Sequence, residues 1–375
     1  MDEISVIQFV PDGPEIFLSI PGPLGVALRL VDSFPNSLIV TSSTDTKKNL
    51  SDARISFSKI KIYKKHQYRK RLATGFSRGF ILRYLQTPIG PIKHLHYSRS
   101  ISTALISLIS LVKNNSLLVV QMHGSVKFEK KFFKRVFDYL FTRRIMRSAD
   151  VIVALQENEK EHLERIGAEK SKIVVIPNFS IPLSDIEKEK LSRKYSSRPQ
   201  VLFVGHLRPS KQVHRFFEIA LLEKFSHCNF VIAGPDGGEL KKLLQDIDLS
   251  NRNNIKYLGS LDWNKLSKVY CESDIILSPA LDAPFDLSFI DGVARGCLGI
   301  ASKEFNNWQQ LDSIGVLIAE DTGIDKLATE LDNALDMIKK GTKTPRDLNV
   351  AAEEIYGQKV ISKRWDNLYR EIGQF

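Results

Sequence analysis

Short apolar runs, each four to six residues long, alternate with amphipathic stretches along almost the whole chain. Such runs are typical of buried strands, and the stretches between them have the spacing of helices. Two long series of this kind predict an α/β protein with two doubly wound, Rossmann-like sheets facing each other across a cleft, where a small-molecule site is expected. The expected strands are residues 5–10, 37–40, 92–97, 117–122, 150–154, 172–176, 201–204, 229–233, 255–258, 274–278, 298–301 and 315–318.

A polar segment rich in serine and charge, at residues 180–199, divides the chain into two parts of ordinary domain size. The 375 residues suffice for two separate cores. We therefore expect an N-terminal domain at residues 1–180, a linker at 181–199 and a C-terminal domain at 200–355. The last segment, residues 356–375, is expected to be a helix that returns to the first domain.

No apolar run reaches the about 18 residues that a membrane span needs, because the longest, at residues 101–112, is broken by serine and threonine. The starting Met-Asp-Glu lacks the basic start and apolar body of a secretion signal. Cys228, Cys271 and Cys297 stand far apart, without metal-site or redox spacing. We expect a globular protein of the reducing cytoplasm with inert, buried thiols.

The net charge of +11 is confined to the first half of the chain. Residues 1–180 carry 28 Lys and Arg against 15 Asp and Glu, and the remaining residues carry 26 against 28. Within residues 47–99 there are 14 basic residues and one acid, with aromatic residues between them. This segment is either a basic surface that faces only water, or it binds an anionic lipid surface or a nucleic acid, and the sequence leaves all three alternatives open.

Residues 127–147 contain eight Lys and Arg, and their apolar residues recur at helical spacing. One face of the expected helix is apolar and the other is cationic. Most such helices turn the apolar face to a core, but a basic amphipathic helix also binds at a membrane surface. Its position in the basic half of the chain favours the membrane interpretation without deciding it.

The stretch at residues 278–302 follows an expected strand, passes through two prolines and continues as a helix from Leu287 that Gly296 ends. Ligands bind where such loops leave the carboxyl ends of parallel strands. Backbone N–H groups at the helix start suit an anionic phosphate, although an ordinary strand–loop–helix connection explains the pattern equally well.

Two further positions in the first half are candidates by the same reasoning. His123 and Gly124 follow an expected strand directly, so His123 is either a site residue or part of a capped turn. Gly22 and Gly25 lie in a turn that would let the backbone approach a ligand closely, or they serve only that turn.

Several motifs, in this order and spacing, resemble those of retaining glycosyltransferases of the GT-B fold, family 4 (group 1), which build bacterial polysaccharides, O-antigens and capsules. Gly205-His-Leu-Arg-Pro-Ser-Lys211 is similar to G-R-L-x-x-x-K, and residues 233–237 to a glycine loop of the family. Residues 150–154 and 176–178 resemble A-D-x-V-I-A and I-P-N. Residues 278–302 resemble the family's P-S-x-x-E-x-F-G-L-x-x-x-E-A-x-A-x-G-x-P-V-I segment.

The resemblance implies a nucleotide-diphosphate sugar as donor and neither a cofactor nor a metal, because positive groups offset the charge of the leaving diphosphate. Lys211 would offset the negative charge of that diphosphate, and Asp291 would accept hydrogen bonds from the ribose hydroxyls. His123 would stand beside the transferred sugar. The residues assigned to the donor are Gly22, Gly25, Gly205, His206, Arg208, Lys211, Gly234, Gly259, Asp286, Leu287, Ser288 and Asp291, and those assigned to catalysis are His123 and Asp282.

The sequence departs from the family pattern at several of these positions. His206 replaces an Arg, so Arg208 is the remaining candidate for that charge. Ala283 replaces the first acid of the acid pair, with Asp282 one place earlier, and Asp286 replaces a Gly. These substitutions would change how the donor is positioned and therefore affect catalysis.

Three hypotheses follow. The first is a retaining, metal-independent glycosyltransferase, peripheral at the inner face of the cell membrane, that acts on a lipid-linked or oligosaccharide acceptor. The second is a non-catalytic GT-B subunit that supports an active partner. The third is a nucleic-acid binder, which the absence of any recognition motif disfavours, so we expect no nucleic-acid partner.

Overall fold

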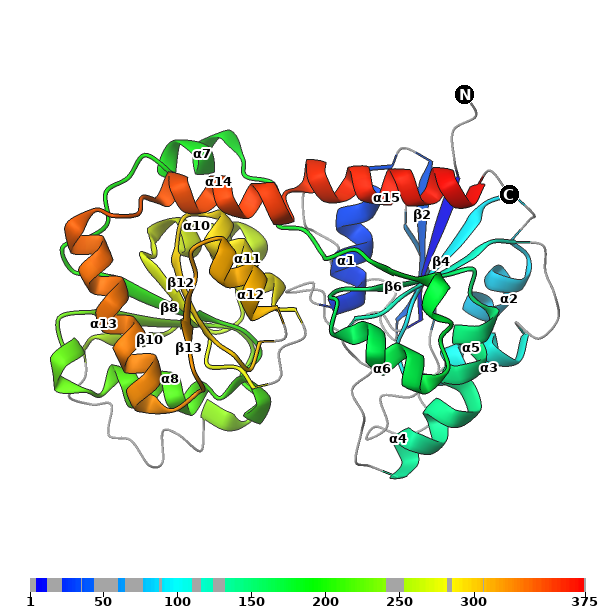
Figure 1. Cartoon of the computed structure of the whole chain (residues 1–375), viewed down its shortest axis with the longest axis horizontal. Helices are drawn as coiled ribbons and strands as arrows, with labels where there is room; N and C mark the ends of the chain where they lie inside the picture. Colours follow the sequence, from blue (N-terminus) through cyan, green and yellow to red (C-terminus); the bar gives the residue numbers. More distant parts are fainter. Residues whose placement is uncertain are drawn as a thin grey trace. The chain divides into compact units, whose positions relative to one another are not determined.

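The computed structural model describes residues 5–11, 22–34, 36–43, 60–64, 77–87, 90–109, 116–123, 132–240, 253–281, 285–305 and 307–373. The chain forms two compact units (Figure 1). Unit 1 comprises Met1–Asn178 with Ile361–Phe375, and unit 2 comprises Phe179–Val360. Each unit contains one parallel sheet and its own apolar core, as the alternating pattern of the sequence predicts.

The sheet of unit 1 has seven parallel strands in the order β3-β2-β1-β4-β5-β6-β7. The chain order reverses between β1 and β4, which makes that pair the topological switch point, the usual ligand position in such sheets. The strands are β1 (Val6–Val10), β2 (Ser37–Ser43), β3 (Ile60–Lys64), β4 (Ile92–His96), β5 (Leu118–Gln121), β6 (Val151–Ala154) and β7 (Ile173–Val175).

The sheet of unit 2 has six parallel strands in the order β10-β9-β8-β11-β12-β13, with its switch point between β8 and β11. Its buried strands pack on helices that carry the expected apolar stripes, such as the one along α8 with Phe216 and Phe217. The strands are β8 (Gln200–Val204), β9 (Asn229–Ala233), β10 (Ile255–Tyr257), β11 (Ile275–Leu277), β12 (Leu298–Ser302) and β13 (Leu317–Ala319).

The helices of unit 1 are α1 (Gly22–Val31), α2 (Arg78–Leu85), α3 (Ile101–Ile109), α4 (Phe132–Phe137), α5 (Arg143–Ser148) and α6 (Glu159–Ile166). Those of unit 2 are α7 (Asp185–Lys190), α8 (Val213–Ala220), α10 (Trp263–Glu272), α11 (Leu287–Ala294), α12 (Trp308–Ser313), α13 (Ile324–Lys340) and α14 (Pro345–Tyr356). The last helix, α15 (Gln358–Gly373), crosses from unit 2 into unit 1.

Helix α15 packs on the first unit through buried aromatic side chains. Trp365 and Tyr369 are at most 1% exposed, and both contact His94 of β4. Arg364 donates a hydrogen bond to the carbonyl of Val175, at the end of β7 (2.7 Å). The C-terminal segment thus completes the core of unit 1 rather than that of the unit it follows in the chain.

Each of the twelve strands expected from the sequence is present, with ends that differ by at most three residues. Strand β3 was not expected, because it lies in the basic stretch, where its lysines interrupt the apolar pattern. Residues 181–199, expected as a linker, belong to unit 2 and contain α7. This helix forms because Ser184 and Glu187 make a capping box at its start.

The expected helix at residues 127–147 is observed from Phe132 onward, as α4, a π-helical turn at Asp138–Thr142, and α5. Residues 127–131 lie outside the described part of the chain. Asp138 starts the π turn, receives two hydrogen bonds from Arg99 (2.8 and 2.9 Å) and one from Thr142 (2.8 Å). Single π-helical turns inside α-helices are frequent at functional sites.

Candidate functional site

Three glycine loops lie side by side at the carboxyl edge of the sheet in unit 2. Gly205 N donates to Ala233 O (3.0 Å), and Gly234 N donates to Gly259 O (2.8 Å). Gly234 has φ +141°, and a Cβ atom there would lie 1.9 Å from the carbonyl oxygen of Gly205, so only glycine fits. The structure thus brings together Gly205, Gly234 and Gly259, which the sequence assigned to one site.

Lys211 and Asp286 meet next to these loops. Lys211 ends a short 3-10 helix after β8, and Leu281 N donates to Ser210 O beside it (2.9 Å). Lys211 Nζ is 2.5 Å from Asp286 Oδ2, and Asp286 caps α11 by accepting from Phe289 N (3.3 Å). A cation and a helix N-terminus therefore converge, at the β8–β11 switch point, on one carboxylate.

This arrangement qualifies the role that the resemblance implied for the start of α11. The first turn, with Leu287 and Ser288, does present N–H groups beside Lys211, but Asp286 supplies the anion from the protein itself. Asp286 is 7% exposed as a residue, and the side chain of Lys211 is 26% exposed. A ligand phosphate that binds here must take the ammonium group from Asp286.

His206 and Arg208 stand in the loop after β8, beside Gly237. A Cβ atom at Gly237 would lie 2.5 Å from Leu207 O and 3.4 Å from both the His206 ring and Arg208 Cγ. Partial burial and then the charge of Arg208 lower the pKa of His206, against the opposing effect of Asp236. His206 is therefore a neutral group at neutral pH, and Arg208, which is exposed, carries the permanent charge of this loop.

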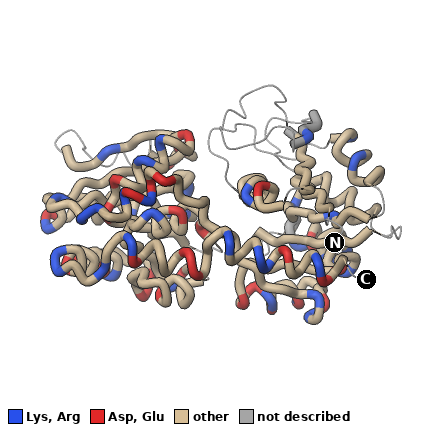
Figure 2. Tube along the Cα trace, turned by 90° about the horizontal axis from the view of Figure 1, so that it is seen from above, with Lys and Arg blue, Asp and Glu red and all other residues tan. Residues whose placement is uncertain are grey.

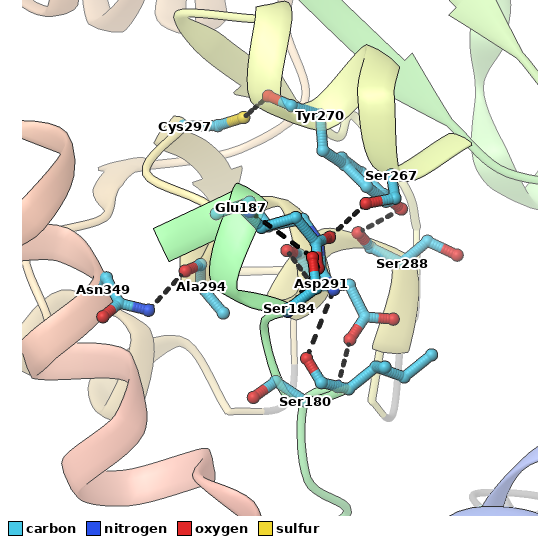
Figure 3. Close-up of polar contacts among 12 residues, drawn as sticks. Ser180, Ser184, Glu187, Ser267, Tyr270, Ser288, Asp291, Ala294, Cys297 and Asn349 are labelled. Carbon is cyan, nitrogen blue, oxygen red and sulfur yellow. Dashed lines mark hydrogen bonds and ion pairs between the residues drawn. The ribbon is translucent and has the colours of Figure 1, made fainter. Parts of the chain in front are cut away.

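Asp291 does not stand open to a ligand in this structure. It is 2% exposed, and its Oδ1 accepts a hydrogen bond from Ile181 N (2.8 Å), within unit 2 (Figure 3). The carboxylate thus holds the segment that follows β7. For Asp291 to bind ribose, as the resemblance implies, this segment would have to move away and release the carboxylate.

A buried ion pair, which the sequence analysis did not identify, lies under the same helix. Arg295 is fully buried, and its Nε donates to Glu187 Oε1 (2.7 Å), which also accepts from the Ser267 hydroxyl (Figure 3). The guanidinium lies over the ring of Trp263, 4.8 Å from its centroid. Burial opposes ionisation of Glu187, but Arg295 and the hydroxyls of Ser267 and Ser184 outweigh it and lower its pKa to about 2.

In unit 1, His123 follows β5 and contacts a second histidine on the neighbouring strand. His123 Nε2 is 3.0 Å from His96 Nδ1, and His96 Nε2 is 3.0 Å from Gln8 Oε1 on β1. His94 stacks on a face of the His96 ring, with ring centroids 4.4 Å apart. These residues come from β1, β4 and β5, which are adjacent at the switch point of this sheet.

Burial lowers the pKa of all three histidines of this group. The pKa of His123 falls to about 3. Burial and then the charge of His123 lower the pKa of His94 to about 3, against the opposing effect of a hydrogen bond that His94 donates to Gln121. The pKa of His96 is lowered well below its ordinary value by burial and then by the other two imidazoles. All three rings are therefore neutral at neutral pH.

The glycines of the first loop lie at the start of a helix. Gly22 is the first residue of α1, and Gly25 is buried within its first turn. Both glycines, which the sequence analysis placed in a turn, thus belong to the helix. Residues 12–21, which connect it to β1, lie outside the described part of the chain, as do Asp282, Ala283, Gly124 and most of the basic stretch at residues 47–76.

No group of three or more His, Cys, Asp or Glu that could hold a metal ion occurs among the residues described. In the same ranges no helix is long and apolar enough to cross a membrane. Cys228, Cys271 and Cys297 are free and buried, and burial raises the pKa of the Cys297 thiol to about 12. The cysteines are the inert thiols that the sequence predicts.

The two parallel α/β units, each with a polar site at the carboxyl edge of its sheet, define the GT-B class of folds. HepE of Anabaena, in a crystal structure with UDP and glucose, is similar to this chain with a TM-score of 0.74 at 12% sequence identity. The similarity covers 98% of this chain and 100% of that one, and it shows the fold.

The family comparison gives the chain's domains. Residues 184–353 match the family "Glycosyl transferases group 1", and residues 37–179 match "Glycosyltransferase Family 4". Along the chain, a family 4-like domain is thus followed by a glycosyltransferase group 1 domain.

Curated relatives are similar at lower coverage. An uncharacterized glycosyltransferase, MJ1607 of Methanocaldococcus jannaschii, is 27% identical over 169 residues, which are 42% of this chain and 43% of that protein. The O-antigen chain mannosyltransferase RfbU of Salmonella typhimurium is 21% identical over 194 residues, 52% of this chain and 53% of RfbU. The chain spans about half the length of the curated relatives it matches.

Proposed function

We propose that this protein is a retaining glycosyltransferase that moves a sugar from a nucleotide-diphosphate sugar to a glycan acceptor. The observation that carries the proposal is the anion site of unit 2, where Lys211 and the N-terminus of α11 converge beside three glycine loops. The UDP and glucose held by HepE support a sugar nucleotide as the ligand.

The chemistry follows from charge. The bond between the sugar and the pyrophosphate breaks, so negative charge develops on the departing phosphate. Lys211 and the helix N-terminus stabilise that charge once Asp286 has given way, which is the work that a divalent ion does in other enzymes. The acceptor hydroxyl attacks from the face that the phosphate leaves, and the phosphate takes its proton, so the configuration of the sugar is retained.

A ligand screen followed by an assay tests this proposal. A nucleotide sugar that binds only the folded state raises the melting temperature, so UDP-, GDP-, ADP- and CDP-sugars are compared in a thermal-shift measurement. Lys211→Ala should abolish the shift, whereas Lys188→Ala, which removes an exposed lysine of the same unit, should preserve it. Binding to none of these donors would count against the proposal.

We further propose a lipid-linked acceptor at the cytoplasmic face of an anionic membrane. Four apolar side chains of α4 and the π turn are exposed, at the spacing of one helix face: Phe132, Val136, Tyr139 and Leu140, with 71, 38, 69 and 39% exposure. Exposed arginines such as Arg135 and Arg147 accompany them. Apolar residues beside cations are what an anionic lipid surface attracts. Acidic and basic residues are interspersed along unit 2 (Figure 2).

Sedimentation with vesicles tests the membrane surface. The double variant Phe132→Ser with Tyr139→Ser should lose binding to vesicles that contain anionic lipid. Ile186→Ser, which changes an equally exposed apolar residue (71%) of unit 2, serves as the matched control. Equal sedimentation of all three proteins, or binding that ignores salt and lipid charge, would contradict a surface of this kind.

A non-catalytic subunit is the second candidate, and the pairing of Lys211 with Asp286 favours it. If the carboxylate keeps the ammonium group permanently, the unit holds no donor and only lends its shape to a partner. Transfer or hydrolysis of a sugar nucleotide by the purified chain would reject this alternative.

A further inference from the structure

We propose that Gln8 and His96 are positioning residues that hold His123 in one tautomer, with the hydrogen on Nε2 and an unprotonated Nδ1 facing the sugar. An unprotonated Nδ1 accepts a hydrogen bond and so recognises a hydroxyl group. The sugar-binding part of this inference rests on the proposed function and on the place beside the transferred sugar that the family resemblance implies for His123.

The order of donors and acceptors starts at Gln8. Its Nε2 donates to Ser37 Oγ (3.1 Å), so its Oε1 is the atom that faces His96 Nε2 at 3.0 Å. An amide oxygen only accepts hydrogen bonds. His96 must therefore carry its hydrogen on Nε2.

The same reasoning passes from His96 to His123. His96 is fully buried, stacks on His94 and lies edge to edge with His123, so it is neutral and has one ring hydrogen. With that hydrogen on Nε2, His96 Nδ1 is an acceptor. His123 Nε2, at 3.0 Å, has to be the donor, which leaves Nδ1 of a neutral His123 without a hydrogen.

The surroundings fit a directing role rather than a random buried contact. Gln8 and His96 are fully buried, and His123 is the partly exposed end of the series. His94 and Trp365 hold the stack from behind, with ring centroids 4.8 Å apart. The hydrogen-bond series thus runs from the core of unit 1 to the carboxyl edge of β5, where a ligand is expected.

Nitrogen NMR of the free, histidine-labelled protein tests the inference without any substrate. We expect the wild-type spectrum to show His123 with the hydrogen on Nε2 in nearly all molecules, and a hydrogen on Nδ1 would overturn the proposal. The assignment uses His123→Gln, which removes the signal.

Gln8→Glu reverses the expected order. A carboxylate next to His96 Nε2 stabilises the doubly protonated ring, whose Nδ1 then donates to His123 Nε2 and moves the hydrogen of His123 to Nδ1. His94→Gln, which removes a stacked ring but no hydrogen bond to His96 or His123, is the matched control and should leave the tautomer unchanged. A Gln8→Glu protein that folds and keeps the wild-type tautomer would overturn the proposal, and the wild-type spectrum decides alone if the variant does not fold.

Turnover of UDP-, GDP-, ADP- and CDP-glucose separates this inference from the proposed function. We expect Gln8→Glu to lower kcat at least tenfold with a smaller change in KM. If Gln8→Glu moves the His123 hydrogen to Nδ1 and still has the kcat of the wild type, Gln8 and His96 are not positioning residues for the reaction. If the wild-type chain turns over none of these donors, the proposed function fails and with it the sugar-binding role, whereas the tautomer itself is still decided by the spectra.

Discussion

The two units bury polar side chains at the same edge of similar sheets, but they do so in opposite ways. In unit 1, burial has removed the charge, and Gln8, His94, His96 and His123 form a neutral group joined by hydrogen bonds and stacking. In unit 2, burial keeps the charge, because Arg295 is paired with Glu187 and Lys211 is paired with Asp286.

The difference teaches what each site can recognise. A titratable group that loses its solvent either becomes neutral or finds an opposite charge. The neutral imidazoles of unit 1 suit the hydroxyl groups of a sugar, which offer directed hydrogen bonds. The cation and helix N-terminus of unit 2 suit an anion such as a diphosphate.

The largest expected effect comes from breaking the buried ion pair of unit 2. Arg295→Met leaves the Glu187 carboxylate without its cation, and such a loss costs about 3–5 kcal/mol in the free energy of unfolding. Urea unfolding followed by Trp263 and Trp308 fluorescence, in a Trp365→Phe background, measures it.

The control for that experiment lies on the same helix α7. Lys188 and Asp185 form an exposed ion pair, with 61 and 95% of the two side chains exposed, and Lys188→Ala should change stability by less than about 0.5 kcal/mol. If Arg295→Met and Lys188→Ala destabilise unit 2 equally, buried charge is not what distinguishes this unit.

Acid should separate the two units next. Below their ordinary pKa of 6.5, the unfolded histidines bind protons that His94 and His96 do not bind in the folded state. The stability of unit 1 therefore falls as the pH decreases through 6.5, by about 1 kcal/mol for each histidine between pH 6.5 and 5.5, or about 2 kcal/mol for both.

The pairing in unit 2 responds at a lower pH. Glu187 has its folded pKa lowered to about 2 from an ordinary 4.5, so its contribution is complete above 4.5 and is lost as the pH falls toward 2. Asp274 and Glu353, whose pKa values burial raises, act in the opposite direction.

Denaturation at several pH values, followed by Trp365 alone in a Trp263→Phe, Trp308→Phe variant, reports on unit 1. A flat profile between pH 6.5 and 5 would mean that its histidines are charged.

Features of the two units could be predicted from the sequence where the residues that form them lie close together in the chain. The strands follow from apolar runs, and the glycine loops from their positions after strands. His94 and His96 are two residues apart on β4 and so share one face, a signal that the sequence analysis passed over. Ser184 and Glu187 have the spacing of a capping box, which would have placed a helix in the expected linker.

The pairings themselves could not be predicted. Arg295 finds Glu187 across 108 residues, and Lys211 finds Asp286 across 75, through the order of the strands. The sequence showed Asp286 at a position of the family's Gly, but not that its carboxylate would occupy the anion site. Local patterns set the elements, and tertiary packing decides which charges meet.

A smaller effect is expected from the anion site. Asp286→Asn keeps a good cap for α11 but removes the charge that holds Lys211, so a nucleoside diphosphate should bind about tenfold more tightly, or about 1.4 kcal/mol. Titration calorimetry with UDP, GDP, ADP and CDP measures the affinity.

Asp262→Asn is the matched control for the anion site, because Asp262 caps α10 in the same unit and pairs with an exposed lysine, Lys265. It should leave the affinity unchanged. Weaker binding by Asp286→Asn would show that the carboxylate assists the ligand rather than competing with it.

The smallest effect should come from the hydrogen bond that joins α15 to the neutral group of unit 1. Tyr369→Phe removes the hydroxyl that lies 2.7 Å from His94 Nδ1. The loss of this one buried hydrogen bond should cost about 1 kcal/mol in the free energy of unfolding. Tyr139→Phe, at a tyrosine that is 69% exposed in the same unit, should cost nothing measurable. Because no charge is lost, the change in unfolding free energy caused by Tyr369→Phe should not depend on salt concentration. A salt-dependent change would mean that His94 is ionised. In that case the two units would bury polar groups in the same way.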